Sequence, residues 1–319
     1  MGFAATAVTF SLFALAAPAA QAEPQTSLNE RPATCAVNQL NQNRFSECQD
    51  LSARVNVVEN VRGANVQVGQ ATFTIKHTMT LSSTSTSWKE TFEVSKAAIT
   101  GKGNGIGVQV AVQSGNGTTA TVSFPKGHTL DSAASGTVTY RTAPIPKQKI
   151  NAKTQTTYRY TFTKPGHTLG GFSYHSATYR CDNYYGTSGC AMTEAPTAVS
   201  MIGLPRIDEA IRNLRAKGGR YGDPHGGPPL NWMINDAQKN KNRTAVCNLT
   251  APPAMKAVGR SSCDEYPFAS TYQGGTGLPA NQRTITWVDK KENDSQGGRI
   301  TNWRRTFHVM DHDPFYVIA

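Results

Sequence analysis

Two neighbouring carboxylates form the densest polar cluster of the chain. Asp264 and Glu265 directly follow Cys263 and precede the stretch from Tyr266 to Phe268, which contains a proline. In an extended segment successive side chains point to opposite faces, so we expect only one of the two carboxylates to face a given site. A solvated acidic pair at the end of a strand is the alternative. The residue types alone favour neither interpretation.

A second polar cluster follows between residues 292 and 305 and combines oxygen ligands with arginines. Carboxylate and amide oxygens suit a hard divalent ion such as Mg²⁺. Arginine side chains bind phosphate oxygens in bidentate geometry. The sequence therefore predicts a metal and phosphate site here, unless the stretch is a polar loop that leads into a half-exposed helix. The candidate metal ligands are Glu292, Asn293 and Asn302, and the candidate phosphate-binding residues are Arg299, Arg304 and Arg305.

Two histidines near the C-terminus offer an alternative chemistry. His308 and His312 lie beside Asp311 and Asp313. Histidine serves as a metal ligand and as a general base, but it is also a common residue of intermediate burial. We keep this pair as a second choice for either role.

The elements that must position these clusters mix helices and strands. Apolar residues at helical spacing predict a helix that opens at Pro205 and ends at Gly218-Gly219. We also expect a helix capped by Asn231, which runs through Trp232, Ile234 and Ala237, and a short helix over 300–307. Strands are expected over 284–288 and 314–318. The region from about residue 195 is therefore predicted to be α+β.

The preceding region follows a different pattern, rich in Thr, Ser, Gly and Val. Ile106 to Val112 alternates with a period of two, a Gly/Asn turn follows, and Val122 to Phe124 alternates on the way back. This pattern predicts a β-hairpin. Thr156, Tyr158, Tyr160 and Phe162 alternate in the same way. We therefore expect an antiparallel all-β sandwich or barrel over residues 23–194.

The first 22 residues resemble a secretory signal peptide, with an uncleaved membrane anchor as the alternative. A nearly continuous apolar run ends at Ala20-Gln21-Ala22, a small-x-small cleavage pattern. Export implies an oxidising compartment, in which cysteines pair. The six cysteines fall into three local couples, but other connectivities remain open. Sequential pairing would join Cys35 with Cys48, Cys181 with Cys190, and Cys247 with Cys263.

Length and charge limit the remaining function classes. The 319 residues correspond to about two domains. The formal net charge of +11 fits a polyanionic partner, although it also fits a merely soluble basic protein. No GxSxG motif occurs, which gives little support to a serine hydrolase.

Taken in order, the two polar clusters resemble the NucA/NucB family of secreted bacterial deoxyribonucleases. The similarity covers about residues 247–319 and is strongest from Cys263 to Thr271 with the following Gln273-Gly274-Gly275. Glu292-Asn293, Gly297-Gly298 and Asn302 form the second match. We identify no family in residues 23–194.

This resemblance implies a ββα-metal nuclease core over part of residues 195–319. It places the general base at Asp264 and a metal ligand on the helix at Asn302. Glu265, Glu292 and Asn293 are weaker candidates. The implied reaction is metal-assisted hydrolysis of DNA phosphodiester bonds with Mg²⁺ or Mn²⁺, by a secreted, extracellular enzyme that binds DNA without sequence preference. The N-terminal β-rich region would be an accessory with an unidentified ligand.

A non-enzymatic function is the alternative. In that case the chain is an extracellular binding or adhesion protein whose nuclease-like module is catalytically inactive. The joint presence of Asp264, Glu265 and Asn302 favours the enzyme.

Overall fold

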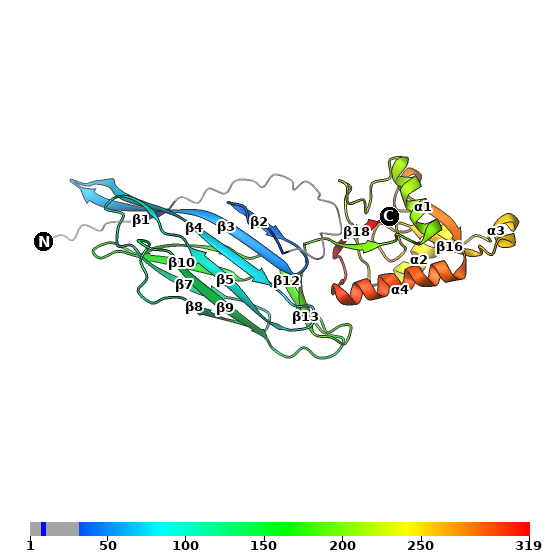
Figure 1. Cartoon of the computed structure of the whole chain (residues 1–319), viewed down its shortest axis with the longest axis horizontal. Helices are drawn as coiled ribbons and strands as arrows, with labels where there is room; N and C mark the ends of the chain where they lie inside the picture. The colour runs from blue at the N-terminus through cyan, green and yellow to red at the C-terminus, as the bar shows by residue number, and fades with distance from the viewer. Residues whose placement is uncertain (1–7, 11–31) are drawn as a thin grey trace. The chain divides into compact units, whose positions relative to one another are not determined.

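The computed structural model describes residues 8–10 and 32–319 (Figure 1). Its contacts divide the chain between Met192 and Thr193 into two compact units, which are described separately below. Most of the expected signal segment 1–22, including its cleavage site, lies outside the described residues. No helix of the described chain is long and apolar enough to cross a membrane.

The first unit contains a large antiparallel sheet in the order β1-β3-β4-β5-β9-β8, with β2 beside β3 and β6 beside β4. Alternating burial along these strands puts apolar side chains on one face and mostly Thr, Ser and charged residues on the other. The strands are β1 (Val8–Phe10), β2 (Gln39–Gln42), β3 (Ser46–Val61), β4 (Ala64–Thr80), β5 (Ser87–Val94), β6 (Ala98–Gly101), β8 (Thr118–Ser123) and β9 (Ala134–Thr142).

A second antiparallel sheet has the order β11-β10-β7, from β7 (Gly107–Gln113), β10 (Thr157–Thr163) and β11 (Gly170–His175). Phe73 and Ile75 of the large sheet share one buried core with Tyr158, Tyr160 and Phe162 of the small one. The region is therefore mostly antiparallel β, as predicted, and its two sheets enclose a common core.

The predicted hairpin of residues 106–124 is wrong. β7 pairs with β10 in the small sheet, whereas β8 pairs with β9 in the large one. The two strands alternate as expected, but the turn between them, at residues 114–117, carries the chain from one sheet to the other. Alternation reports which face of a strand is buried and not which strand lies beside it.

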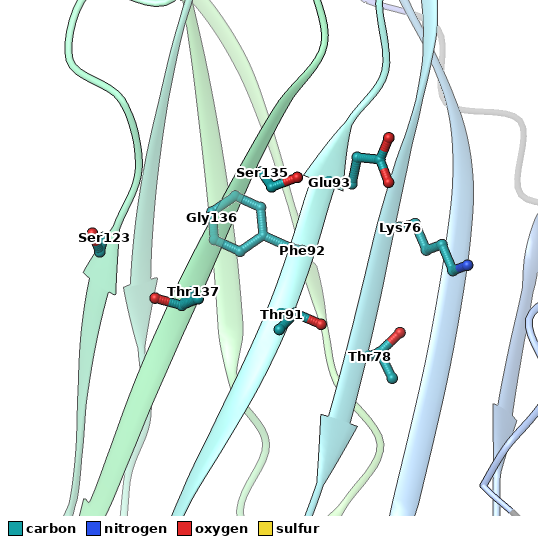
Figure 2. A pocket seen from close by; sticks show the side chains of 9 residues that line it. All are labelled: Lys76, Thr78, Thr91, Phe92, Glu93, Ser123, Ser135, Gly136 and Thr137. Carbon is teal, nitrogen blue, oxygen red and sulfur yellow. The ribbon is translucent and has the colours of Figure 1, made fainter.

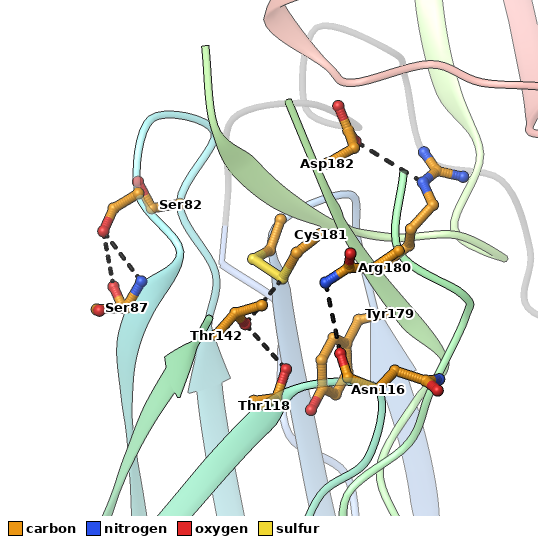
Figure 3. The surroundings of a disulfide bond; sticks show 12 residues. Ser82, Ser87, Asn116, Thr118, Thr142, Tyr179, Arg180, Cys181 and Asp182 are labelled. Atoms are coloured by element: carbon orange, nitrogen blue, oxygen red, sulfur yellow. Dashed lines mark hydrogen bonds and ion pairs between the residues drawn. A yellow bond between two sulfur atoms is a disulfide. The ribbon is translucent and has the colours of Figure 1, made fainter. Parts of the chain in front are cut away.

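A two-stranded sheet, β12 (Tyr179–Asp182) with β13 (Gly189–Met192), ends the first unit. The disulfide Cys181–Cys190 joins these strands, and Thr142 Oγ1 lies 3.5 Å from the sulfur of Cys181 (Figure 3). The other disulfides are Cys35–Cys48 and Cys247–Cys263. All three are the sequential couples.

Three carboxylates of the described residues lie in the interior of the first unit, namely Glu47, Glu90 and Asp182. Glu90 accepts hydrogen bonds from the hydroxyls of Tyr140 and Tyr158 and contacts His77 Nδ1. Glu47 is 1% exposed, and its Oε2 accepts a hydrogen bond of 2.7 Å from the backbone N–H of Ala177. Burial raises the pKa of Glu47 to about 8, so this group favours the neutral form in the folded chain.

The second unit is α+β, as predicted. Parallel β14 (Thr197–Ser200) and short β15 (Leu230–Asn231) flank β18 (Pro314–Ile318), and β16 (Ser262–Tyr266) pairs antiparallel with β17 (Thr284–Val288). The helices are α1 (Pro205–Ala216), α2 (Asp236–Cys247), α3 (Pro253–Ala257) and α4 (Lys290–Thr306), with a 3₁₀ turn η1 (Ala280–Gln282). The expected helix from Pro205 and the strands 284–288 and 314–318 are confirmed.

Two helix predictions need correction. Asn231 belongs to β15, and α2 begins only at Asp236, where Asn235 Oδ1 accepts a hydrogen bond of 3.0 Å from Gln238 N–H. The helix expected over 300–307 begins at Lys290 and is capped by Asp289. Its first turns bury the polar residues Glu292 and Gln296, so no apolar stripe reveals them in the sequence.

Candidate active site

The site lies on a strand–strand–helix unit, β16-β17-α4, to which α2 adds a second wall. Between α2, β16 and α4 the surface is hollowed into a cleft of about 580 Å³. The residues of α2 in this cleft recur at helical spacing, as do those of α4, so each helix presents one face to it. The lining comprises Trp232, Lys239, Asn240, Arg243, Asp264, Glu265, Phe268, Ala269, Ser270, Asn293, Asp294, Gln296, Gly297, Ile300, Thr301 and Arg304.

Asp264 lies on β16 and lines the cleft, although it is only 6% exposed. Burial, followed by the charge of Glu265, raises the pKa of Asp264 to about 7. The amide of Gln296 and the guanidinium of Arg243 act in the opposite direction. The result is a carboxyl group that exchanges its proton near neutral pH.

Glu265 is 7% exposed, and burial is also the main cause that raises its pKa. Its Oε2 lies 3.2 Å from the sulfur of Cys247, whose disulfide with Cys263 ties α2 to β16. Glu265 lines the cleft and also a neighbouring hollow of about 330 Å³ that Tyr266 and Ile285 share. Both carboxylates thus line the cleft, but Glu265 is shared with the neighbouring hollow and Asp264 is not.

Three of the candidate residues on α4 have different surroundings. Asn293 lines the cleft, together with Gln296 one turn later. Asn302 is exposed on α4 and is not among the lining residues. It lies nine residues, or about two and a half turns, after Asn293 and therefore on the opposite face of the helix. Glu292 Oε1 accepts hydrogen bonds of 2.7 and 3.0 Å from the N–H groups of Arg206 and Ile207. Glu292 therefore caps the start of α1.

The three candidate arginines also lie in different surroundings, and only one of them lines the cleft. Arg304 lines the cleft, and its guanidinium carbon lies 4.2 Å from the ring centroid of Trp232, a cation–π contact that orients the side chain. Arg299 donates to the carbonyl oxygens of Ser200 and Ile202, at 3.3 and 2.6 Å. Arg305 is exposed outside the cleft lining.

Sequence reasoning missed two cations, Lys239 and Arg243, and two amides, Asn240 and Gln296, of the cleft. Lys239 and Arg243 lie one turn apart on α2, and Gln296 lies on α4. The spacing of these residues shows that they share a helix face only when the starts of α2 and α4 are known. The sequence pattern predicts both starts at other residues. Arg243 also donates a hydrogen bond of 3.3 Å to the carbonyl of Cys263, which holds the guanidinium beside β16.

The histidines lie elsewhere. His308 is 1% exposed, and His312 stacks on Tyr272 with ring centroids 4.1 Å apart. Asp311 Oδ1 accepts a hydrogen bond from Ile234 N–H and approaches the Tyr272 hydroxyl at 3.2 Å. Neither histidine lines the cleft.

Comparison with known proteins identifies the region around this cleft. Residues 225–318 match the family model described as Deoxyribonuclease NucA/NucB. The match lies in the C-terminal region and contains β16, β17, α4 and all of α2. No curated protein and no solved structure matches the chain.

Proposed function

We propose that the second unit is a metal-dependent endonuclease that hydrolyses DNA phosphodiester bonds without sequence preference. The observation that carries this proposal is the cleft, in which the buried carboxyl of Asp264 shares the lining with the cations Lys239, Arg243 and Arg304. The match of residues 225–318 to a deoxyribonuclease family supports DNA as the substrate.

Asp264 acts as the general base in this proposal. A base is most effective when its pKa lies near the operating pH, and the raised pKa of about 7 brings Asp264 into that range. The ionised carboxylate accepts a proton from the attacking water. Gln296 and Arg243 favour the ionised form, so they support the state that the reaction requires.

The donor set of the cleft fits a hard divalent cation, Mg²⁺ or Mn²⁺. The carboxylates Asp264, Glu265 and Asp294 and the amides Asn240, Asn293 and Gln296 offer oxygen, and no cysteine or histidine lines the cleft. Among the described residues no three acidic, histidine or cysteine side chains form a chelating group. Mg²⁺ commonly takes one or two carboxylates together with water and substrate phosphate.

Asn293, Gln296 and one carboxylate would hold the ion in this proposal. When bound, the ion neutralises charge on the phosphate and on the leaving oxygen. Asn302 and Glu292 are less suited, since one is exposed outside the cleft and the other caps α1. Arg304 contacts the scissile phosphate, and Lys239 and Arg243 hold its neighbours by charge alone. Such contacts carry no base sequence information.

We further propose that the protein acts outside the cytoplasm, as a secreted nuclease. Three disulfides with no free cysteine in the described chain fit an oxidising compartment.

Plasmid digestion by the purified protein tests the enzyme proposal. We expect nicking with Mg²⁺ or Mn²⁺, none with EDTA, and a loss of about a hundredfold or more in Asp264→Asn, since general-base catalysis contributes about 10²–10⁴-fold. Glu209→Gln removes an exposed carboxylate of α1 and serves as the matched control. Equal nicking by the Asp264→Asn variant and the wild-type protein would move the base elsewhere, and no nicking with any metal would leave a non-enzymatic binding protein.

A further inference from the structure

The first unit has an uneven charge distribution along its sequence. Between Asp131 and Asp182 the chain has seven lysine and arginine residues and no aspartate or glutamate. Asp182 itself is fully buried, with Arg180 Nε 3.7 Å from its Oδ2 (Figure 3). Arg141 of this stretch lies on β9 in the large sheet, so the exposed cations that remain for the small sheet and the loop before it are Lys147, Lys149, Lys153 and Arg159.

Part of this stretch forms the outer face of the small sheet. The side chains of Tyr158, Tyr160 and Phe162 point into the core, so the intervening residues of β10 point outward. Arg159 is exposed there, with Ala111 of β7 and Ser173 of β11 as its neighbours in register. The remaining outward positions are Gly107, Gln109, Gln113, Thr157, Thr161, Thr163, Gly171 and His175. We call this surface the acid-free face.

A loop with three exposed lysines leads directly into β10. Lys147, Lys149 and Lys153 lie on it, and Lys153 is within about 14 Å of Thr157 by chain length. The backbone of this lysine loop is held in place, because Asn183 N–H donates to Lys149 O and Asn151 N–H donates to Cys181 O. The three charges therefore extend from a fixed backbone.

The outer face of the large sheet differs in charge. Lys76 of β4 lies in register between two acidic residues, Asp50 of β3 and Glu93 of β5. Figure 2 shows Lys76 and Glu93 at one side of a hollow of about 460 Å³ on this face, which Thr and Ser residues also line. This face therefore has carboxylates among its cations, which also include Arg54, Lys89 and Arg141, whereas the outward positions of the small sheet include no carboxylate.

We propose that the acid-free face and the lysine loop bind the phosphate backbone of duplex DNA and hold it for the nuclease unit. This inference rests on the proposed function for its substrate. Lys, Arg, Ser, Thr and Gln side chains are the groups that contact DNA phosphates, and all five types occur on this surface. No Phe, Tyr or Trp side chain of the described residues points outward on it, and His175 is its one ring. Single-strand binding relies on such rings for base stacking, so the duplex backbone is the better fit.

The test measures DNA binding by the full-length protein in EDTA, where cleavage is blocked. A short fluorescent duplex is titrated by anisotropy at several NaCl concentrations. The variant Lys149→Gln/Lys153→Gln/Arg159→Gln changes two positions of the lysine loop and one of the acid-free face, and we call it the acid-free-face variant. The matched control, Arg54→Gln/Lys76→Gln/Lys89→Gln, removes the same charge from exposed positions of the large sheet.

Each lost phosphate contact reduces the slope of log K against log salt by about 0.9 for duplex DNA. We therefore expect the acid-free-face variant to lower this slope by about 2–3, and the control to leave it within about 1. Equal slopes in the two variants would overturn the proposal, because only total charge would then matter. The proposal would also be overturned if the variant still binds duplex DNA but no longer binds anionic phospholipid vesicles. That result would indicate that this surface binds a membrane.

Failure of the nuclease proposal remains distinguishable. If the wild-type protein cuts no DNA with any metal but binds duplex in EDTA through the acid-free face, the binding inference stands and the enzyme does not. If the acid-free-face variant binds duplex as tightly as wild type while Asp264→Asn abolishes cutting, the enzyme stands and the binding inference fails.

Discussion

Gly297 and Gly298 provide a matched pair of substitutions in α4. A Cβ added at either position meets no atom within 4 Å, so Gly297→Ala and Gly298→Ala fit the folded chain without strain. Gly297 lines the cleft, and Gly298 does not. The two variants therefore differ only in where the new methyl group points.

Both substitutions should stabilise the second unit. Alanine in a helix interior is more favourable than glycine by about 0.5–1 kcal/mol, which corresponds to a melting temperature about 2–4 °C higher for a unit of this size. The effect on activity should differ. A methyl group at Gly297 occupies space that the DNA backbone would enter, and a displacement of about 1 Å can cost about a hundredfold in rate.

The assay combines thermal unfolding with nicking rates at saturating Mg²⁺. We expect Gly297→Ala to melt higher and cut about ten- to a hundredfold more slowly, and Gly298→Ala to melt higher and cut like wild type. If Gly297→Ala cuts at the wild-type rate, the substrate does not pass along α4 and the assignment of the cleft is wrong. If both variants lose activity equally, the helix needs its flexibility and the methyl position is irrelevant.

Three further outcomes follow from the described contacts. In this proposal Asp264 must be ionised to act, and its pKa is about 7. We therefore expect kcat/KM to rise about tenfold from pH 6 to pH 8, with a midpoint that bound Mg²⁺ shifts to lower pH. A pH profile that is flat would argue against Asp264 as the base. Folded Glu47 keeps its proton up to about pH 8, whereas the unfolded carboxyl, with its ordinary pKa of 4.5, releases it near that pH. The folded state thus binds more protons in this window, so stability falls as pH rises through it, by about 1.4 kcal/mol per pKa unit. Glu47→Gln should flatten that loss in urea titrations, while an unchanged slope would place the effect on another group. Asn293→Ala should raise the Mg²⁺ concentration needed for nicking by about tenfold or more, whereas the exposed Asn302→Ala should leave it within about twofold; the reverse order would return the metal ligand to Asn302.

The extent to which the sequence predicts this fold depends on where apolar residues lie. Ile207, Ile211 and Leu214 are buried at helical spacing, so α1 was predictable from pattern alone. The first turns of α4 bury Glu292 and Gln296 instead, and a hydrophobic pattern cannot show polar burial. The strand alternation of β7 and β8 was visible, but their partners are set by contacts between distant segments.

The candidate site was predictable to a similar extent. Family resemblance located Asp264 and the α4 region, because the chemistry is concentrated in short motifs. Lys239 and Arg243 reach the cleft from α2, which begins at Asp236. The apolar residues Trp232 and Ile234 before it suggested an earlier start of this helix. Those two residues lie before the helix, where the chain forms a bridge from Trp232 to Thr271.

The disulfide between Cys247 and Cys263 has a consequence for the cell that makes this protein. It covalently links the helix that carries Arg243 to the strand that carries Asp264. Cytoplasmic glutathione and thioredoxin keep thiols reduced, so a newly synthesised chain lacks this link. If the protein is an exported nuclease as proposed, the two walls of the cleft become linked only after export, and a cleft that needs this link to cut DNA would spare the producer's own chromosome.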